Sequence, residues 1–323
     1  MIKPKILSTL INEMNLKQKI IEFINAGYDL KIFLKYSFKV GNLKEKSHFV
    51  AYLTKQYHTI EKGLALPDVK LGFGEKKIND LIFVGSAYIK RFGNDYLIDN
   101  IISVLNKYVK YHNEKGFESE IIEDIRIFIG NRNSNSTTGG VRNYTESNLK
   151  PEAYEAFVKG RASVRNFKNI PVSKDKVLKA IEVAKYTPSV CNRQGWKLHV
   201  YNGNDVPKLL KLQNGNRGFE QSIRTIAIIT GDVQFFSNNE RNQVGIDSGM
   251  FAMSLILAFY SIGIGTCALN TCVSVRSEVR IKKAANIPEN EKVIMYMALG
   301  YPTEDCVVAK SLRRDSESFV TFH

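Results

Sequence analysis

The stretch that decides the fold reads TPSVCNRQGW over residues 187–196. It stands between an expected helix, Ser173–Tyr186, and an expected strand, Trp196–Tyr201. Ser173 is a suitable N-cap for the helix, and the strand is rich in β-branched and aromatic residues. Polar groups on a loop between two rigid elements are a common way to hold a ligand. An ordinary helix-to-strand turn with a core tryptophan explains this stretch, taken alone, equally well.

Helices and strands continue to alternate beyond this turn. Strands are expected over Thr225–Thr230 and Lys292–Leu299, and helices over Met250–Ser261 and Ser274–Ala285. Such interleaving indicates an α/β or α+β sheet domain.

One uncharged segment, between Asp247 and Arg276, is long enough to cross a bilayer. It contains several serines and threonines, with Gly263 and Gly265 in its middle. We therefore expect a buried helix, a Gly-Ile-Gly turn and a short buried strand, and no membrane span.

The first 130 residues have a different texture. Apolar residues at three- and four-residue spacing predict helices over Ile6–Phe23, Ser47–Tyr57, Asn79–Phe92 and Tyr96–His112. Three glycines and Pro67 predict a loop over Thr59–Gly74.

A polar stretch, NRNSNSTTGGVRN over residues 131–143, is typical of a linker. The sequence thus predicts three parts: a mainly helical region over residues 1–130, a linker over 131–150 and a sheet domain over 151–323.

Composition fits a globular chain of about two domains, since 44% of the 323 residues are hydrophobic and 24% are charged. The net charge is +14, and each half, divided after Lys150, has 23 Lys and Arg against 16 Asp and Glu. Such a field favours anionic partners without choosing among phosphates, nucleotides, nucleic acid and acidic membranes. The four cysteines lack zinc or CxxC spacing and the N-terminus lacks a signal-peptide pattern, so we expect a cytoplasmic protein with free thiols and no metal site.

Residues 161–165 read RASVR, and an extended backbone would point Arg161, Ser163 and Arg165 to one side. Two guanidinium groups and a hydroxyl suit a phosphate and a polar ring edge, because arginine offers forked, permanently charged donors. A solvated basic strand edge is the better explanation of this motif by itself.

Two further motifs complete the pattern, one with two glycine-containing stretches and one at a strand end. Glycines in GIDSG (residues 245–249) and GIGT (263–266) would let backbone approach a flat ligand, although helix packing explains them as well. The strand end LGYP (299–302) is followed by Lys310, Arg313 and Arg314, which could close over a phosphate or form a solvated tail.

The order and spacing of these four motifs resemble the nitroreductase family over residues 157–314. That resemblance implies a three-layer α+β fold with a central mixed sheet, bound FMN at a homodimer interface, and electron transfer from NAD(P)H to a nitro, quinone or other conjugated small molecule. It implies no membrane span and no nucleic acid as partner.

On the phosphate side, the resemblance implies that Arg161 holds the FMN phosphate, with Lys310 and Arg313 as late partners. Ser163 would bind the phosphate or the ribityl chain.

On the ring side, Arg165 would lie at the N1/O2 edge of the flavin and Asn216 would read its pyrimidine. Backbone near Asn270 and Thr271 would lie near N5, and no side chain is implied as a catalyst because the flavin does the chemistry. Donor and acceptor would then alternate at one face, giving ping-pong kinetics.

The resemblance further implies that Pro188, Ser189 and Asn192 reach the FMN of the other subunit. Gly195 replaces the family's proline, and Val190 stands where a small polar residue is common. Asn270-Thr271 stands where a Glu-Gly pair is frequent.

Two alternatives remain open. The protein could dehydrogenate a biosynthetic intermediate through FMN and pass the electrons to oxygen, which the helical extension favours. It could also be a non-enzymatic basic binding module that uses its Lys- and Tyr-rich N-terminal helices.

Overall fold

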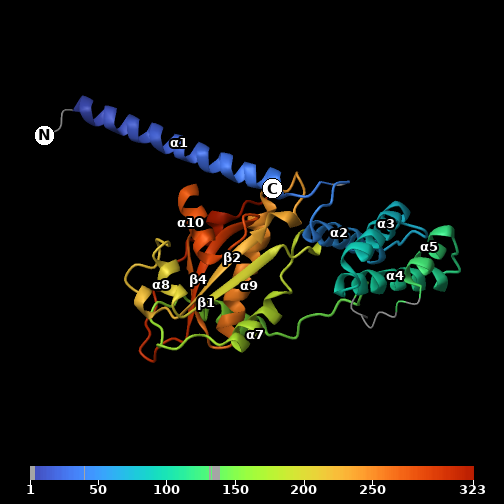
Figure 1. Ribbon diagram of the computed structural model, residues 1–323. Coiled ribbons are helices and arrows are strands. Elements are labelled where there is room, and N and C mark those ends of the chain that lie inside the picture. Colours follow the sequence, from blue (N-terminus) through green and yellow to red (C-terminus); the bar gives the residue numbers. More distant parts are fainter. Residues whose placement is uncertain (1–3, 40, 131, 133–138) are drawn as a thin grey trace.

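The computed structural model describes residues 4–39, 41–130, 132 and 139–323. Figure 1 shows three parts: a long helix α1, a helical region α2–α5, and a sheet with helices on both faces. The expectation of a mainly helical N-terminal region is confirmed.

Helix α1 (Pro4–Tyr36) is longer than expected and projects from the body over α10 (Figure 1). Its C-terminal part, from Asn25 onward, is anchored to the sheet domain. The Asn25 side chain accepts a hydrogen bond from Val275 N at 3.1 Å, and Asp29 forms an ion pair with Lys292 at 2.6 Å.

Four helices form the rest of the helical region: α2 (Lys46–Leu64), α3 (Glu75–Phe92), α4 (Tyr96–Glu114) and α5 (Glu120–Ile129). They enclose an apolar core of their own, which includes Leu53, Ile78 and Leu105. The expected loop over Thr59–Gly74 was wrong in its first part. Ile60 and Leu64 are buried at helical spacing, so α2 continues to Leu64.

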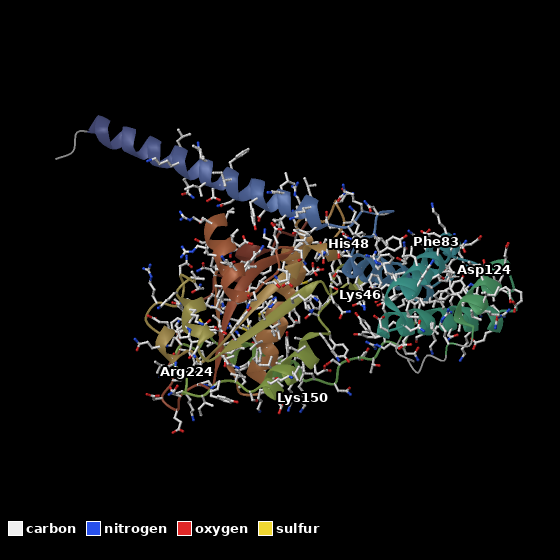
Figure 2. The ribbon with its side chains drawn as sticks, in the orientation of Figure 1. Lys46, His48, Phe83, Asp124, Lys150 and Arg224 are labelled. Carbon is white, nitrogen blue, oxygen red and sulfur yellow. The ribbon has the colours of Figure 1, made fainter. Side chains whose placement is uncertain are left out.

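A second apolar cluster joins the helical region to the sheet domain. Phe38, Ala51 and Tyr52 from the N-terminal side pack with Phe235 and Phe236 from the C-terminal side. In Figure 2, Phe83 and Asp124 mark the helical region, and Arg224 lies at the far side of the sheet domain.

Residues 131 and 133–138 of the expected linker lie outside the described residues. Residues 139–150 carry no helix or strand, and α6 (Pro151–Gly160) follows. The amides of Gly139 and Gly140 donate to Ser103 Oγ and Glu61 Oε1, so the described part of this segment lies against the helical region.

The sheet has four strands in the order β1-β2-β4-β3, where β1 is Trp196–Asn202, β2 Thr225–Asp232, β3 Gly265–Leu269 and β4 Glu291–Gly300. All three ladders are antiparallel. The parallel component of the expected mixed sheet is a bridge between Ser163 and Thr266 at the outer edge of β3. The strands expected over Trp196–Tyr201, Thr225–Thr230 and Lys292–Leu299 are confirmed as β1, β2 and β4.

Helices cover both faces of this sheet, which gives three layers. Helices α8 (Asp205–Leu210) and α10 (Val275–Ala285) pack on the face that carries Ile226, Ile228 and Tyr296. Helices α7 (Lys174–Ala184) and α9 (Gln243–Ser261) pack on the face that carries Ala227, Ile229 and Met297. Neighbouring residues of one strand thus enter different layers, as strand geometry requires. The α+β expectation is confirmed.

Helix α9 begins at Gln243, seven residues before the expected start at Met250. Asp247 and Ser248 are fully buried inside it, a polar pattern that hid the first two turns. Among the described helices, α9 alone has the length and hydropathy of a membrane-spanning helix. Its apolar side packs on the sheet through Phe251, Leu255 and Phe259, as a core helix does.

Candidate functional site

The turn between α7 and β1, residues 188–194, has an unusual backbone. Cys191, Asn192 and Gln194 all have positive φ, at 50°, 55° and 53°. Side chains other than glycine rarely adopt this conformation, which costs on the order of 1–3 kcal/mol for each residue. The turn therefore depends on contacts that hold it in shape.

Several hydrogen bonds supply that support. Val190 N donates to Asp247 Oδ2 at 3.1 Å, and Gln194 N donates to Ser189 Oγ at 3.0 Å. The side-chain Nε2 of Gln194 also donates to Asn192 Oδ1 at 3.2 Å. Burial raises the pKa of Asp247, although hydrogen bonds from Gln243 and Val190 oppose the rise.

Gly195 closes the turn because a side chain would not fit there. A Cβ atom at this position would lie 2.9 Å from Phe235 Cβ and 3.0 Å from the Phe236 ring. Trp196 follows and stacks on Phe251 of α9, with ring centroids 4.7 Å apart.

A different construction holds residues 161–165, which with Gly265 form the surface that we call the Arg161 corner. Val164 N donates to Thr266 O at 2.9 Å, so main-chain pairing fixes this segment beside β3. A Cβ on Gly265 would lie 2.9 Å from the Val164 side chain. Glycine thus permits the close approach of the two segments.

Two polar side chains of the Arg161 corner lie near the Cys267 thiol. Burial raises the pKa of the Cys267 thiol, while the Arg165 charge and a hydrogen bond from Ser163 oppose the rise. Ser163 and Arg165 therefore both lie near Cys267. Neither the Arg161 nor the Arg165 guanidinium group has a hydrogen-bond or ion-pair partner among the described residues.

Arg161 also lines a pocket of about 290 Å³ with Gly263, Gly265 and Thr303. The buried Thr303 hydroxyl oxygen in this pocket has no hydrogen-bond partner within the described part of the chain. Val308 reaches the same pocket, so the C-terminal tail passes it.

Lys310 and Arg313 follow in that tail, and both are exposed. The Arg313 guanidinium donates to the carbonyl of Ser311 within the tail. The described contacts do not bring either side chain to Arg161.

Asn216 and Asn270 belong to two loops that contact each other. Gln213 Nε2 donates to Asn270 O at 2.9 Å, and Gln213 Oε1 accepts from Gly215 N at 2.6 Å. The buried Asn216 donates through Nδ2 to Leu210 O at 2.7 Å. Thr271 Oγ1 donates to Ile294 O at 2.8 Å, which fixes the chain beyond β3.

The sheet register separates the turn from the Arg161 corner. Trp196 begins edge strand β1 and pairs with Gly231, which pairs with Lys292. At the opposite edge, Ser163 lies beside Thr266, which pairs with Leu299 near the other end of β4. Four strand spacings, about 19 Å, therefore separate Trp196 from Ser163 across the sheet.

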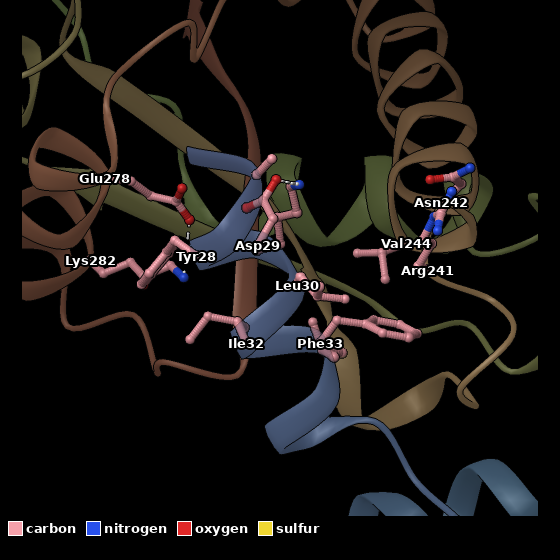
Figure 3. A pocket seen from close by; sticks show the side chains of 13 residues that line it. Tyr28, Asp29, Leu30, Ile32, Phe33, Arg241, Asn242, Val244, Glu278 and Lys282 are labelled. Atoms are coloured by element: carbon pink, nitrogen blue, oxygen red, sulfur yellow. Dashed lines mark hydrogen bonds and ion pairs between the residues drawn. The ribbon is translucent and has the colours of Figure 1, made fainter. Parts of the chain in front are cut away.

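The cleft of Figure 3 is a third location, between α1 and the sheet domain. It measures about 390 Å³ and is lined by Tyr28, Phe33, Arg241 and Lys282 among others. None of the residues predicted for the site lines it.

Sequence reasoning missed two residues that shape the turn, Glu240 and Asp247. Glu240 binds Arg193, 47 residues away in the chain. Asp247 lies in the part of α9 that was expected to precede the helix. The signal available was an acidic residue inside an otherwise uncharged helix.

The C-terminal domain is thus a three-layer α+β domain, in which Gly265 lets residues 161–165 lie close beside β3. Residues 158–216 and 234–301 match the family described as Nitroreductase family. Through this C-terminal half, the chain belongs to the nitroreductase family and is an oxidoreductase.

Known relatives cover the same half. A 4-nitrobenzoate reductase of Nocardioides sp. (strain LMS-CY) is 24% identical over 224 residues, 53% of this chain and 90% of the relative. An iodotyrosine deiodinase of Nematostella vectensis is 24% identical over 213 residues, 54% and 78% of the two chains. A solved nitroreductase family protein of Streptococcus pneumoniae TIGR4 is 20% identical with a TM-score of 0.46, covering 53% of this chain and all of that one.

Proposed function

We propose that this protein is an FMN-dependent oxidoreductase that passes electron pairs from NAD(P)H to a nitro, quinone or other conjugated organic acceptor. The observation that carries the proposal is the Arg161 corner, where two guanidinium groups with no partner in the described part of the chain lie near Ser163 in a nitroreductase-family domain. Relatives named 4-nitrobenzoate reductase, from Nocardioides and from Pseudomonas putida, support a nitroaromatic acceptor.

The donors at this corner fit a phosphate. Arg161 lines a pocket of about 290 Å³, and the forked donors of a guanidinium group suit phosphate oxygens. Arg161 would therefore hold the FMN phosphate with Ser163 beside it. Lys310 and Arg313 would join it only if the tail folds back.

The ring would lie toward Arg165 and the Asn270 loop. Bound FMN supplies a ring that accepts and returns electron pairs. Arg165 would stabilise negative charge at the pyrimidine edge, and Asn216, whose Nδ2 is already used, would offer its Oδ1. The backbone at Asn270 and Thr271, fixed by Gln213 and by Ile294 O, would border the reacting face. Donor and acceptor would occupy that face in turn, which gives ping-pong kinetics.

A second copy of the chain would complete the site. Among the described contacts, none joins Pro188, Ser189 or Asn192 to the Arg161 corner of their own chain. The outer face of α9 exposes Ile246, Met250 and Met253 at helical spacing, and such an apolar patch marks an interaction surface. We therefore propose a homodimer with FMN at the interface.

The remaining proposals concern organisation and location. The four cysteines are free thiols in the structure, which supports a cytoplasmic location. Helical residues 1–130, a connection over 131–150 and the flavin domain over 151–323 stay the proposed division of the chain.

The test is the visible spectrum of the purified protein, followed by anaerobic addition of NADPH or NADH. Stoichiometric FMN that bleaches is the expected result. FMN that stays oxidised would favour the dehydrogenase that passes electrons to oxygen. A protein that takes up no FMN from excess would overturn the proposal, and salt-sensitive binding to nucleic acid would then be measured.

A further inference from the structure

The turn 188–194 contains a buried cation, Arg193, whose side chain is fully enclosed. Its Nη1 and Nη2 donate to the two carboxylate oxygens of Glu240 at 2.9 and 2.7 Å. Its Nε donates to Val190 O at 3.1 Å. All three nitrogens of the guanidinium group thus bind, and one of these bonds returns to the turn itself.

Glu240 is held from its other side by Ser237. Both the amide and the hydroxyl of Ser237 donate to Glu240 Oε2 at 2.7 Å. Burial acts to raise the pKa of Glu240, but the donors Arg193 and Ser237 outweigh it and hold this pKa below its ordinary value. The carboxylate is therefore ionised and fixed, as a partner for a buried arginine must be.

The N-terminal region contributes to the surroundings of this ion pair through Phe38. The Arg193 guanidinium lies 5.9 Å from the ring of Phe38 and 5.4 Å from the ring of Phe236. Phe38 N donates to Phe236 O at 3.0 Å, which ties the chain after α1 to the loop before α9. Val50 of α2 packs in the same cluster as Val190 of the turn.

We propose that Arg193 is a positioning residue for the flavin site. Together with Glu240 and Phe38, it holds the turn 188–194 in its left-handed backbone shape, and it makes the N-terminal helical region part of the scaffold that presents Pro188, Ser189 and Asn192. This inference rests on the proposed function, in which the turn contacts FMN bound by a second copy.

The energetics favour a role in shape over a role in stability. A buried ion pair contributes little net stability because desolvation offsets its attraction, whereas it can specify one geometry among several. Three residues of the turn have a left-handed backbone conformation, which persists only where surrounding contacts hold it in place. Arginine is suited to this task, since its planar fork fixes direction as well as charge.

The experiment compares Arg193→Lys with the wild-type full-length protein. Lysine keeps the charge and removes the fork and the bond to Val190 O. Amide hydrogen exchange of residues 190–196 and emission of Trp196, the sole tryptophan, report the turn without any flavin. FMN titration of the flavin-free protein and the rate of flavin reduction by NADPH report the site.

Two matched variants separate position from stability. Arg126→Lys alters an exposed ion pair in which Arg126 of α5 binds both carboxylate oxygens of Glu118. This pair is far from the turn in the chain. Leu105→Ala removes a buried side chain from the core of the helical region and lowers stability without touching the turn. Glu240→Gln removes the charge of the partner and serves as a second test should Arg193→Lys fold poorly.

We expect faster exchange over residues 190–196 and an FMN dissociation constant raised about tenfold to hundredfold in Arg193→Lys and Glu240→Gln. Arg126→Lys and Leu105→Ala should leave both unchanged. Unchanged exchange at the turn would overturn the inference. Faster exchange with unchanged FMN affinity would overturn its link to the flavin and leave the proposed function intact. Wild-type protein that takes up no FMN would overturn both.

Discussion

The Arg161 corner and the turn 188–194 lie at opposite edges of one sheet and are built by different means. Main-chain pairing between Val164 and Thr266 holds the Arg161 corner, and the close approach needs only Gly265. Buried side chains hold the turn, through Arg193 with Glu240 and through Asp247 with Val190 N.

This difference separates side chains that are free to bind a ligand from side chains that are already used. At the Arg161 corner, the fold needs little from the guanidinium groups, which leaves them available to an anion. At the turn, the side chains of Arg193 and Asp247 serve the fold. Ser189 is half-buried and Asn192 is exposed, and both also accept hydrogen bonds from Gln194 within the turn.

The largest expected effect breaks the turn. Arg193→Leu would leave the Glu240 carboxylate without its cation in a site that stays mostly buried. Loss of one partner of a buried pair costs about 3–5 kcal/mol. Urea unfolding should show a loss of that size. The control Arg126→Leu, at an exposed pair with Glu118, should lose about 1 kcal/mol or less. Equal losses in both variants would contradict the comparison.

The second effect tests the Arg161 corner. Arg165→Ala should change the free energy of unfolding by no more than about 0.5 kcal/mol, because Arg165 is exposed and its side chain has no hydrogen-bond partner among the described residues. FMN affinity should fall by about 1.5–3 kcal/mol, the range for a hydrogen bond to a charged group.

The control for Arg165→Ala is Lys179→Ala, which removes one positive charge from an exposed position on α7. It should leave FMN affinity unchanged. A large stability loss in Arg165→Ala, or equal affinity losses in both variants, would show that this side chain serves the fold or only the overall charge.

Much of the fold follows from local pattern. Ser173 caps α7 as expected, and Ser274 caps α10 in the same way; each side chain accepts a hydrogen bond from the amide three residues on. The strands are visible because apolar residues alternate between two packed faces, as Ile226 and Ala227 do in β2. The end of α2 was missed because Pro67 and three glycines concealed the helical spacing of Ile60 and Leu64.

Less of the site follows from the sequence. The alternation of Arg161, Ser163 and Arg165 predicts a shared side; Ser163 and Arg165 both lie near Cys267, and for Arg161 the shared side stays a prediction. The pairing of Arg193 with Glu240 needs the tertiary fold, because 47 residues separate them. Phe38, still further away, reaches the same place only through the packing of α1 and α2. Long-range side-chain pairs leave no periodic trace in a single sequence.

The smallest effect concerns acid stability and distinguishes the two modes of construction again. The pKa of Glu240 in the folded protein lies below its ordinary value of 4.5, because hydrogen bonds from Arg193 and Ser237 outweigh burial. The unfolded chain therefore binds this proton first as pH falls. The stability from Glu240 is present above about pH 4.5 and is lost as pH falls through the folded pKa.

Glu240→Gln removes this contribution, so its stability should depend less on pH than that of the wild type between about pH 6 and pH 3. Over this pH range, the difference in the free energy of unfolding between the wild type and Glu240→Gln should change by less than about 1 kcal/mol. Solvent screens this carboxylate because it is partly exposed. Urea unfolding at several pH values measures it. Glu155→Gln is the control: the pKa of Glu155 is also lowered, by Lys159, but this pair is exposed on α6 and should add nothing measurable. A wild type and a Glu240→Gln variant with parallel pH profiles would mean that Arg193 does not hold Glu240 ionised in the folded protein.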